Sequence, residues 1–391
     1  MITYEKALKL ALDSGFPLGE EKCTYLESVG RVLSKDILSD IDMPPFNRSA
    51  MDGYACRRSD LEQELEVIEV IPAGVFPKKK IGAGQCAKIM TGAPVPEGAD
   101  TVIMVELTKQ ISDSHIVYTG KKTKSNIALK AEDVKVGDVV LKKGTLIQPK
   151  HIAVLASVGA VEVEVYKKPR IAIVSTGDEL VEPNQIPQAS QIRNSNAYQM
   201  LAQAMELGIE AEYIGVAKDT KESTKEMLLK AIERADIIIM SGAVSMGDFD
   251  FVPIVLREQG VDILFHGMEI KPGKRVIFGV KDKKWFVGVP GNPVSSFVQF
   301  EMLVKPLVYK IMGANYETLL FRLPLAHDYK RKRKGRKAFE PIVITEQGRV
   351  EKADYNGSAH IHALAYAQGL MIIEADIVEL KEGDLVDVRP I

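Results

Sequence analysis

The sequence predicts a multidomain protein that combines an open α/β sheet with mostly β parts. Three short apolar runs, at 170–175, 236–240 and 285–289, are rich in β-branched residues and show almost no polar alternation. Such runs are typical of strands buried on both faces of a parallel sheet, and the segments between them have helical spacing. Elsewhere, short strand-like runs separated by turn residues indicate β domains.

The chain is predicted to begin with a helix over 4–14, capped by Thr3 and ended by Gly15. A second helical segment is expected over 20–30. The stretch 42–55 (DMPPFNRSAMDGYA) then combines two prolines with polar residues and glycine, which is typical of a fixed loop. Both a rigid domain linker and a loop that reaches a functional site fit this pattern.

Residues 61–142 are predicted to form a small, mostly β domain, because turn signals such as Pro72-Ala73-Gly74 separate its short apolar runs. The expected strands are 66–71, 85–90, 101–107, 115–118 and 138–141. A short helix over 148–157, with Pro149 in its first turn, is expected to lead into the α/β region.

Helices are also expected within the α/β region. Asp219 and Glu222 form a candidate capping box, and Asn292-Pro293 supplies a capping side chain and a first-turn proline. Pro306 should kink the helix that follows. The expected helices are 196–207, 219–235 and the segment from 293 to 312.

The C-terminal part is predicted to contain β-strands and carries a dense basic run at 330–337 (KRKRKGRK). The expected strands are 319–324, 339–344, 370–373 and 385–389. The basic run could attract nucleic acid or an acidic partner. Because the run lacks aromatic residues for base stacking and the charge of the whole chain is balanced, a charged hairpin tip is the favoured interpretation.

Each apolar run of the α/β region ends in a loop of glycines, hydroxyls and carboxylates, at 176–180, 241–250 and 290–296. In open α/β sheets, ligands bind beyond the carboxyl ends of the strands. The string PGNPVSS, which opens a helix, is a candidate anion cradle. A Pro-Gly turn between Lys271 and the pair Lys274, Arg275 adds cations that would bind a small dianion.

The loops also carry the carboxylates Asp178, Glu179, Asp248 and Asp250. Carboxylates beside phosphate-binding loops suit Mg²⁺, so the sequence predicts metal-assisted handling of a phosphorylated substrate. Each carboxylate could instead cap a helix, and Lys271 could lie in solvent. The convergence of three loops at one sheet edge favours a site.

Composition excludes several classes of function. The 391 residues are 46% hydrophobic and 27% charged, as in a globular protein of several domains, and the net charge of −2 argues against a general nucleic-acid binder. No apolar stretch approaches a membrane span, and the N-terminus lacks the pattern of a signal peptide. The cysteines Cys23, Cys56 and Cys86 are widely spaced, which argues against a disulfide framework or a zinc site. A cytoplasmic protein is therefore expected.

Six strings occur in a fixed order along the chain: FNRSAMDGYA, MTGAPVPEGAD, STGDEL, SGAVSMGDFD, IKPGK and GVPGNPVSSF. With them, nearly the whole chain closely resembles the molybdopterin molybdenumtransferase family, which includes the MoeA proteins and the E domain of gephyrin. The resemblance implies a split linking or dimerisation domain, an inserted β domain, a MogA/MoaB-like α/β domain that binds molybdopterin, and a C-terminal β-barrel. Their expected ranges are 1–40 with 143–167, 41–142, 168–315 and 316–391.

The resemblance further implies an enzyme that takes adenylylated molybdopterin and molybdate, inserts the metal and releases AMP with the help of Mg²⁺. It implies a homodimer, with a molybdopterin adenylyltransferase of MogA/MoaB type upstream and molybdoenzymes or their chaperones downstream. Residues implied to take part in the chemistry are Asp52, Thr91 and Asp133 from a second subunit, and Glu179, Asp219, Asp250, Lys271 and Lys274. Those expected to line the nucleotide and oxyanion site are Thr176, Gly177, Gly242, Ser245, Gly247, Gly291 and Ser295, with Ser358 approaching it and with Glu179 and Asp250 supporting Mg²⁺.

Two positions depart from the family pattern. Asn47 stands where relatives often have Asp, which puts any metal or water role of that position in doubt. Gly267 stands where relatives often have Lys, so the oxyanion site should be less positive unless Lys274 or Arg275 compensates. Three alternatives remain: an ATP-dependent molybdopterin adenylyltransferase, a tungstate-inserting paralogue, and a non-enzymatic scaffold. The strings MDGYA and MTGAP argue against the first, because the stand-alone adenylylating proteins lack the β domain.

Overall fold

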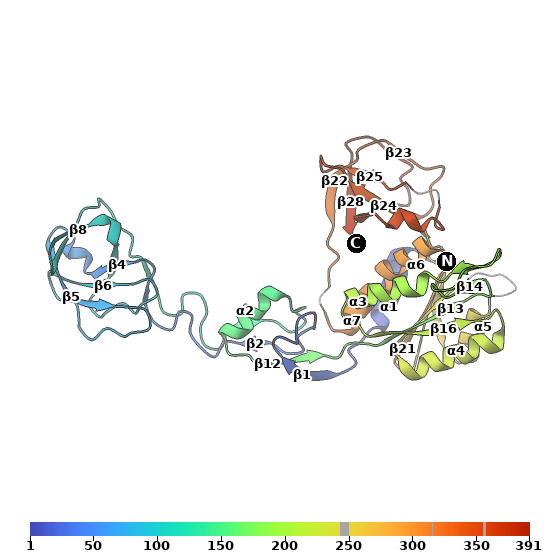
Figure 1. Ribbon diagram of the computed structural model, residues 1–391, viewed down its shortest axis with the longest axis horizontal. Coiled ribbons are helices and arrows are strands. Elements are labelled where there is room, and N and C mark those ends of the chain that lie inside the picture. The colour runs from blue at the N-terminus through green and yellow to red at the C-terminus, as the bar shows by residue number, and fades with distance from the viewer. Residues whose placement is uncertain (243–249, 315, 355–356) are drawn as a thin grey trace. The chain divides into compact units, whose positions relative to one another are not determined.

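The structure is a computed structural model that describes residues 1–242, 250–314, 316–354 and 357–391, and Figure 1 shows its helices and strands. The chain divides into two compact units. The first comprises Met1–Ser34, Gly144–Gln148 and Glu162–Ile391, and the second comprises Lys35–Lys143 and Pro149–Val161. The finer division into four domains stays a prediction. Within the described residues, none of the helices has both the length and the apolar character that a membrane crossing requires.

The first unit is built on a six-stranded sheet whose order is β16-β13-β17-β21-β20-β18. Its strands are β13 (Ile171–Thr176), β16 (Ala211–Ala217), β17 (Ile237–Ser241), β18 (Asp262–His266), β20 (Ile277–Lys281) and β21 (Lys284–Val289). The three predicted strands, β13, β17 and β21, are confirmed, and they are parallel neighbours. Their loops therefore leave the same edge of the sheet. β20 and β18 extend the sheet in antiparallel pairing.

Helices cover both faces of this sheet, as Figure 1 shows. They are α1 (Tyr4–Ser14), α3 (Asn196–Glu206), α4 (Lys221–Arg234), α5 (Val252–Glu258), α6 (Pro293–Gln299) and α7 (Lys305–Ile311). Ile173 and Ile239 pack in the core that contains α1, α3, α6 and α7. Val174 and Met240 point to the opposite face, beneath α4 and α5. Because water reaches neither face, the strands need no polar alternation, and each buried aliphatic side chain contributes about 1.5–3 kcal/mol.

The α-helix expected from 293 to 312 is interrupted before Pro306 by a π-helical segment, Phe300–Val304, which joins α6 to α7, and the predicted kink at Pro306 stays a prediction. Proline has no N–H to donate to the carbonyl four residues earlier, that of Met302. The Tyr4 hydroxyl donates to this carbonyl instead, at 3.1 Å. Burial raises the pKa of Tyr4 to about 12, so the hydroxyl keeps its proton. The first helix thus supplies the hydrogen bond that the proline removes.

The helix expected over 20–30 is wrong. Residues Glu20–Thr24 form β1, which pairs antiparallel with β12 (Glu162–Tyr166). Pairing with a strand far along the chain outweighs the weak local preference for helix.

The C-terminal part contributes a second sheet of order β19-β24-β26-β28-β22, with β25 also paired to β24. Its strands are β19 (Ile270–Lys271), β22 (Phe321–Pro324), β24 (Lys337–Ile344), β25 (Val350–Lys352), β26 (Gly369–Ile373) and β28 (Leu385–Pro390). The predicted C-terminal strands are confirmed within a few residues. The hairpin interpretation of the basic run is wrong, because β23 (Tyr329–Lys330) pairs with β27 (Glu379–Leu380) and not with β24.

A buried ionic cluster joins the two sheets of the first unit. Glu301, in the π-helical segment, lies 3.2 Å from Arg389 of β28 and 3.0 Å from Lys305. Gln203 of α3 donates to the same carboxylate at 3.0 Å. Glu301 and Arg389 are each only 2% exposed. Because solvent cannot screen either charge, each side chain neutralises the charge of the other.

The second unit is mostly β, as predicted. Its main sheet has the order β7-β4-β6-β5-β9-β8. These strands are β4 (Gly53–Cys56), β5 (Glu64–Ile71), β6 (Gln85–Ile89), β7 (Thr101–Met104), β8 (Thr108–Ser112) and β9 (His115–Tyr118). Two short pairs and a helix complete it: β2 (Ile37–Leu38) with β11 (Val139–Leu141), β3 (Arg48–Ser49) with β10 (Ile127–Ala128), and α2 (Pro149–Ser157). The strand expected over 101–107 ends at Met104, where a 3₁₀ turn begins.

Candidate active site

The loops that follow β13, β17 and β21 line one cavity of about 630 Å³ at the carboxyl edge of the α/β sheet. Its lining combines glycines, small polar side chains and carboxylates with Arg193. The predicted site residues among those that line it are Thr176, Gly177, Glu179, Asp219, Gly242, Asp250 and Gly291. The sheet thus brings together residues from four separate loops, as the prediction of ligand binding at this edge requires.

The glycines at this edge are needed because the backbones of neighbouring loops lie very close together. Thr176 ends β13, and its hydroxyl donates to the Ser241 carbonyl at 3.2 Å. Gly242 has a φ of +97°, and a Cβ at this position would lie 2.6 Å from Thr176 Oγ1. A Cβ at Gly291 would lie 3.8 Å from the Cα of Gly242. The backbones after β13, β17 and β21 therefore touch one another without intervening side chains.

Replacing Gly242 with Ala should lower substrate affinity and turnover by about tenfold or more, because a strained backbone and a clash with Thr176 together displace the loop. Steady-state kinetics would measure this. The matched control is Gly348→Ala: Gly348 also has a positive φ, +72°, but a Cβ there meets nothing within 4 Å. Equal activity of the two variants would contradict a specific need for close approach at Gly242.

Asn196 holds two of these loops together, a role that the sequence analysis missed. Its Nδ2 donates to Ser241 Oγ at 3.0 Å and to the Gly291 carbonyl at 2.8 Å. Asn194 acts in a similar way beneath the site, where its Oδ1 accepts from Ser175 Oγ at 3.2 Å. Two asparagines at the start of a helix, one just before it and one as its first residue, were a local signal for such bonds, but they resemble ordinary helix caps in sequence.

Three carboxylates face the cavity: Glu179, Asp219 and Asp250. The candidate capping box at Asp219 is wrong, because Thr220 caps α4 and its hydroxyl accepts from the Ser223 N–H. Asp219 instead exchanges hydrogen bonds with Asp178, each backbone N–H donating to the other carboxylate at 3.3 Å. Asp219 therefore lines the cavity and does not cap the helix.

The predicted Mg²⁺ ligands Glu179 and Asp250 line the same cavity. Among the described residues, no group of three or more histidine, cysteine or carboxylate side chains is placed to hold a metal ion. Mg²⁺ commonly takes one or two protein carboxylates and completes its shell with water and substrate oxygens, so this donor set fits it. Ser245, Gly247 and Asp248 lie outside the described residues.

The helix start at 292–296 differs from the predicted anion cradle. The Val294 N–H donates to the Ser358 carbonyl at 3.1 Å, and Asn292 Nδ2 donates to Ser358 Oγ at 2.9 Å. The Val294 N–H, which an anion would have used, is therefore already bonded to Ser358. Ser295 is buried and packs beneath the 271–274 turn, where a Cβ at Gly273 would lie 3.5 Å from Ser295 Cβ. Asn292 and Pro293 still line the cavity.

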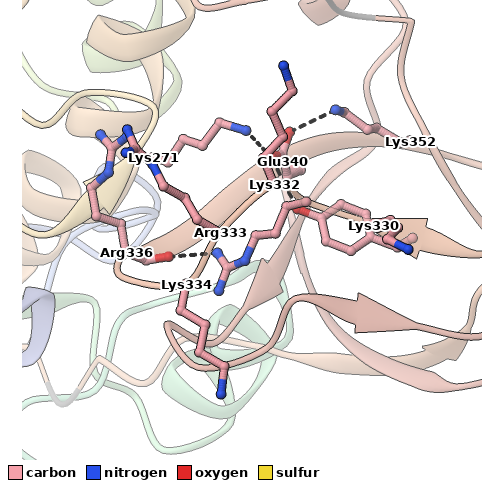
Figure 2. A pocket seen from close by; sticks show the side chains of 10 residues that line it. Lys271, Lys330, Lys332, Arg333, Lys334, Arg336, Glu340 and Lys352 are labelled. Atoms are coloured by element: carbon pink, nitrogen blue, oxygen red, sulfur yellow. Dashed lines mark hydrogen bonds and ion pairs between the residues drawn. The ribbon is translucent and has the colours of Figure 1, made fainter.

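The predicted cation Lys271 lines a different cavity, of about 340 Å³, shown in Figure 2. Its ammonium lies 3.1 Å from the carboxylate of Glu340. We call this hollow the basic cavity. It is lined by Lys271, Tyr329, Lys330, Arg331, Lys332, Arg333, Lys334, Arg336, Glu340 and Lys352. Most of the basic run thus surrounds a hollow, and only one carboxylate is present among its lining residues.

The 271–274 turn connects the surroundings of the two cavities. Gln299 of α6 donates to the Gly273 carbonyl, and α6 begins at the cavity beside β21. Lys274 is exposed on this turn, and its carbonyl accepts from the Met268 N–H at 3.0 Å. Gly267 has a φ of +94°, and a Cβ there would lie 2.8 Å from Met1 Cγ. A lysine at position 267 would therefore be strained.

In the second unit, Asp52 and Thr91 lie together on the surface. Asp52 Oδ1 accepts from the Thr91 N–H at 2.6 Å and from its hydroxyl at 2.8 Å. Both bonds lower the pKa of Asp52, and the bond from the Thr91 backbone has the larger effect. Asp133 is exposed in the same unit, and its N–H donates to the Met43 carbonyl at 3.1 Å. Asn47 Oδ1 accepts from the Lys130 N–H at 2.8 Å, a bond that holds the loop.

Thr91→Val should raise the pKa of Asp52 part of the way to its ordinary value, because the variant keeps the backbone bond and loses the hydroxyl. The stabilisation that ionised Asp52 contributes is present at neutral pH and lost as pH falls through its pKa, so the variant should lose it at a higher pH. An NMR titration of the carboxyl carbon measures the pKa, and urea denaturation at several pH values measures the loss of stability. Thr123→Val is the control, and an unchanged Asp52 pKa would refute the assignment.

Comparisons with known proteins agree with this geometry. Three family descriptions match successive parts of the chain: "MoeA N-terminal region (domain I and II)" at 2–159, "Probable molybdopterin binding domain" at 172–310, and "MoeA C-terminal region (domain IV)" at 322–391. A molybdopterin molybdenumtransferase of Staphylococcus epidermidis (strain ATCC 35984) is 33% identical over 398 residues, covering 99% of this chain and 95% of the relative. That of Staphylococcus aureus (strain Mu50) is 34% identical over 372 residues, covering 93% and 89%.

A solved structure extends the likeness to the whole fold. The molybdopterin biosynthesis moeA protein from Pyrococcus horikoshii OT3 has a TM-score of 0.85 and 33% sequence identity, with all of both chains covered. The resemblance inferred from the six strings is thereby confirmed. The chain belongs to the MoeA family of molybdopterin molybdenumtransferases.

Proposed function

We propose that this chain inserts molybdenum from molybdate into adenylylated molybdopterin and releases AMP. The observation that carries the proposal is the pair of cavities on the first unit. The cavity beside β13, β17 and β21 offers glycine backbones, hydroxyls and carboxylates, whereas the basic cavity gathers cations. A nucleotide with a bound cation fits the first kind of lining, and an oxyanion fits the second.

Within the first cavity, the substrate would contact the backbone of four residues: Thr176, Gly177, Gly242 and Gly291. Glu179 and Asp250 would hold Mg²⁺, with Asp219 beside them. When bound there, the ion neutralises charge on the leaving phosphate oxygens. The chain's own groups would orient the substrate, because Asn196 fixes the relative positions of the loops that carry Ser241 and Gly291.

Lys271 is the cation that we assign to the oxyanion. Its ammonium carries three donors, and Glu340 uses one of them. The turn that follows it, 271–274, accepts a hydrogen bond from Gln299 at the end of α6, and α6 begins at the first cavity. Lys274, exposed on the turn, would add charge to the phosphate side.

The remaining expectations from the sequence are part of the same proposal. The enzyme would act in the cytoplasm as a homodimer in which Asp52, Thr91 and Asp133 come from the second subunit. Molybdopterin adenylyltransferase would supply its substrate, and molybdoenzymes or their chaperones would take its product. The four-domain division would then separate dimerisation, the β domain, pterin binding and the C-terminal sheet.

The test is to incubate the protein with adenylylated molybdopterin, Mg²⁺ and either molybdate or tungstate, and to follow AMP. Release that depends on molybdate supports the proposal, and faster release with tungstate would assign the chain to a tungstate-inserting branch. Adenylylation of molybdopterin by ATP, without oxyanion-dependent release, would overturn it in favour of an adenylyltransferase. Binding of the adenylylated pterin without any turnover would overturn it in favour of a scaffold.

A further inference from the structure

Glu340 is a buried carboxylate among the residues that line the basic cavity, and Figure 2 shows its contacts with Lys271 and Lys352. It is 1% exposed, whereas the two lysines that contact it, Lys271 and Lys352, are 44% and 39% exposed. Oε1 lies 3.1 Å from Lys271 Nζ and accepts from the Tyr329 hydroxyl at 3.4 Å. Oε2 lies 3.4 Å from Lys352 Nζ. One carboxylate therefore holds two ammonium groups that face the cavity.

A carboxylate at this position is not explained by the packing of the sheet. Its neighbours along β24, Ala338, Phe339 and Ile342, are apolar and fully buried. Among the described residues, no donor gives Glu340 Oε2 a hydrogen bond, and an incompletely bonded buried carboxylate destabilises a fold. An apolar residue would pack there without this cost. The carboxylate is therefore explained better by what it does to the two lysines.

The backbone fixes the places of both lysines. β19 pairs in parallel with the start of β24, with Lys271 opposite Ala338, which lies on the same face as Glu340 because side chains alternate. β25 pairs with the end of β24, with Lys352 opposite Ile342. Each lysine thus lies on the strand beside β24, opposite a residue two positions from Glu340, which makes it a diagonal cross-strand neighbour of Glu340. Hydrogen bonds of three strands set the distance between the ammonium groups before any ligand arrives.

Arg331, in the same lining, shows that these cations differ in role. Its guanidinium donates to the carbonyls of Arg336 at 2.8 Å and of Glu374 at 2.6 Å, and also to that of Ile377. Arg331 therefore shapes the loop. Lys271, in contrast, uses one of its three donors on Glu340 and points its ammonium at the cavity.

We propose that Glu340 is a positioning residue that sets the Lys271 and Lys352 ammonium groups as a preformed clamp for a tetrahedral oxyanion. The inference rests on the proposed function, because it takes the oxyanion as the substrate that Lys271 contacts. The carboxylate has a second effect: its negative charge weakens the hold of the cavity on the anion, so that the anion can leave for the reaction. Glu340 thus lowers the affinity of the cavity for the oxyanion and aligns the two ammonium groups that bind it.

Glu340→Gln separates these effects. Loss of the negative charge should tighten the binding of molybdate alone by about three- to tenfold, measured by equilibrium dialysis. Loss of alignment should lower kcat for AMP release by about tenfold. Glu340→Asp keeps the charge but not the reach, so its molybdate affinity should stay within twofold of the wild type while kcat falls. A role in stability alone would lower the active fraction and leave the affinity of the folded protein unchanged.

A double-substitution cycle tests whether Glu340 acts through Lys271. The kcat of Glu340→Gln/Lys271→Met should be no lower than that of Lys271→Met alone. The control is Glu374→Gln: Glu374 is exposed, pairs with Lys337 at 2.8 Å and lies outside both cavities, so its kcat and molybdate affinity should stay within twofold.

Two results would overturn the inference: multiplicative losses of kcat in the double variant, or molybdate binding that is weaker in Glu340→Gln than in the wild type. Failure of the proposed function is distinguishable from both. In that case the wild-type protein would release no AMP with either oxyanion, and the dialysis of molybdate would still report whether Glu340 moderates an anion site.

Discussion

Lys271→Met is expected to lower molybdate-dependent AMP release by about 10²–10³-fold, the effect typical of removing one preorganised donor from a reacting group. The side chain of Lys271 is 44% exposed, so its loss creates no cavity in the core. Glu340 keeps the contact with Lys352. Single-turnover measurements with adenylylated molybdopterin would give the loss, and circular dichroism would show whether the fold is kept.

Lys230→Met is the matched control, because Lys230 pairs with Glu226 on the exposed side of α4 and lines neither cavity. Its AMP release should stay within twofold of the wild type. Lys271→Arg keeps the charge but changes the donor geometry, and should retain part of the activity. A Lys271→Met protein that releases AMP at the wild-type rate would remove Lys271 from the mechanism.

Glu301→Ala is expected to lower the free energy of unfolding by about 3–5 kcal/mol, because it leaves a buried positive charge without its partner. Arg389 is 2% exposed and would keep only its contact with Met302 Sδ at 3.2 Å among the side-chain hydrogen bonds of the described residues. Urea denaturation of the first unit, followed by the fluorescence of the buried Trp285, would measure the change.

Two comparisons make this stability prediction specific. Glu226→Ala, which removes an exposed partner of Lys230, should change the free energy of unfolding by less than about 1 kcal/mol. Glu301→Met combined with Arg389→Met should be less destabilised than Glu301→Ala, since no buried guanidinium is then left uncompensated. If Glu301→Ala unfolds at the wild-type urea concentration, the cluster contributes no net stability.

Local sequence was enough to predict the α/β sheet and the edge of the sheet at which the larger of the two cavities lies. The strands β13, β17 and β21 are buried on both faces, so they lack polar alternation and stand out in the sequence. Their loops meet because neighbouring parallel strands end at the same edge. The residues Thr176, Gly242 and Gly291 could therefore be placed together before any coordinates.

The basic cavity could not be predicted in this way, because strand pairing over a long sequence separation creates it. Glu340 lies 69 residues from Lys271 in sequence, and β19 is only two residues long. No periodicity is measurable in so short a strand. The same limit explains the error at β1, whose partner β12 lies far along the chain. Ser358 likewise reaches α6 through a contact between distant loops.

The pairing of β19 with β24 also has a consequence during translation. Ribosomes add about 5–20 residues per second, and N-terminal segments fold as they emerge. The parallel strands of the α/β sheet are complete once Val289 has been made. Lys271, however, finds Ala338 and Glu340 only after synthesis has proceeded well past that point. A nascent or prematurely terminated chain that ends before Glu340 can therefore contain all the parallel strands but lacks the carboxylate that contacts Lys271.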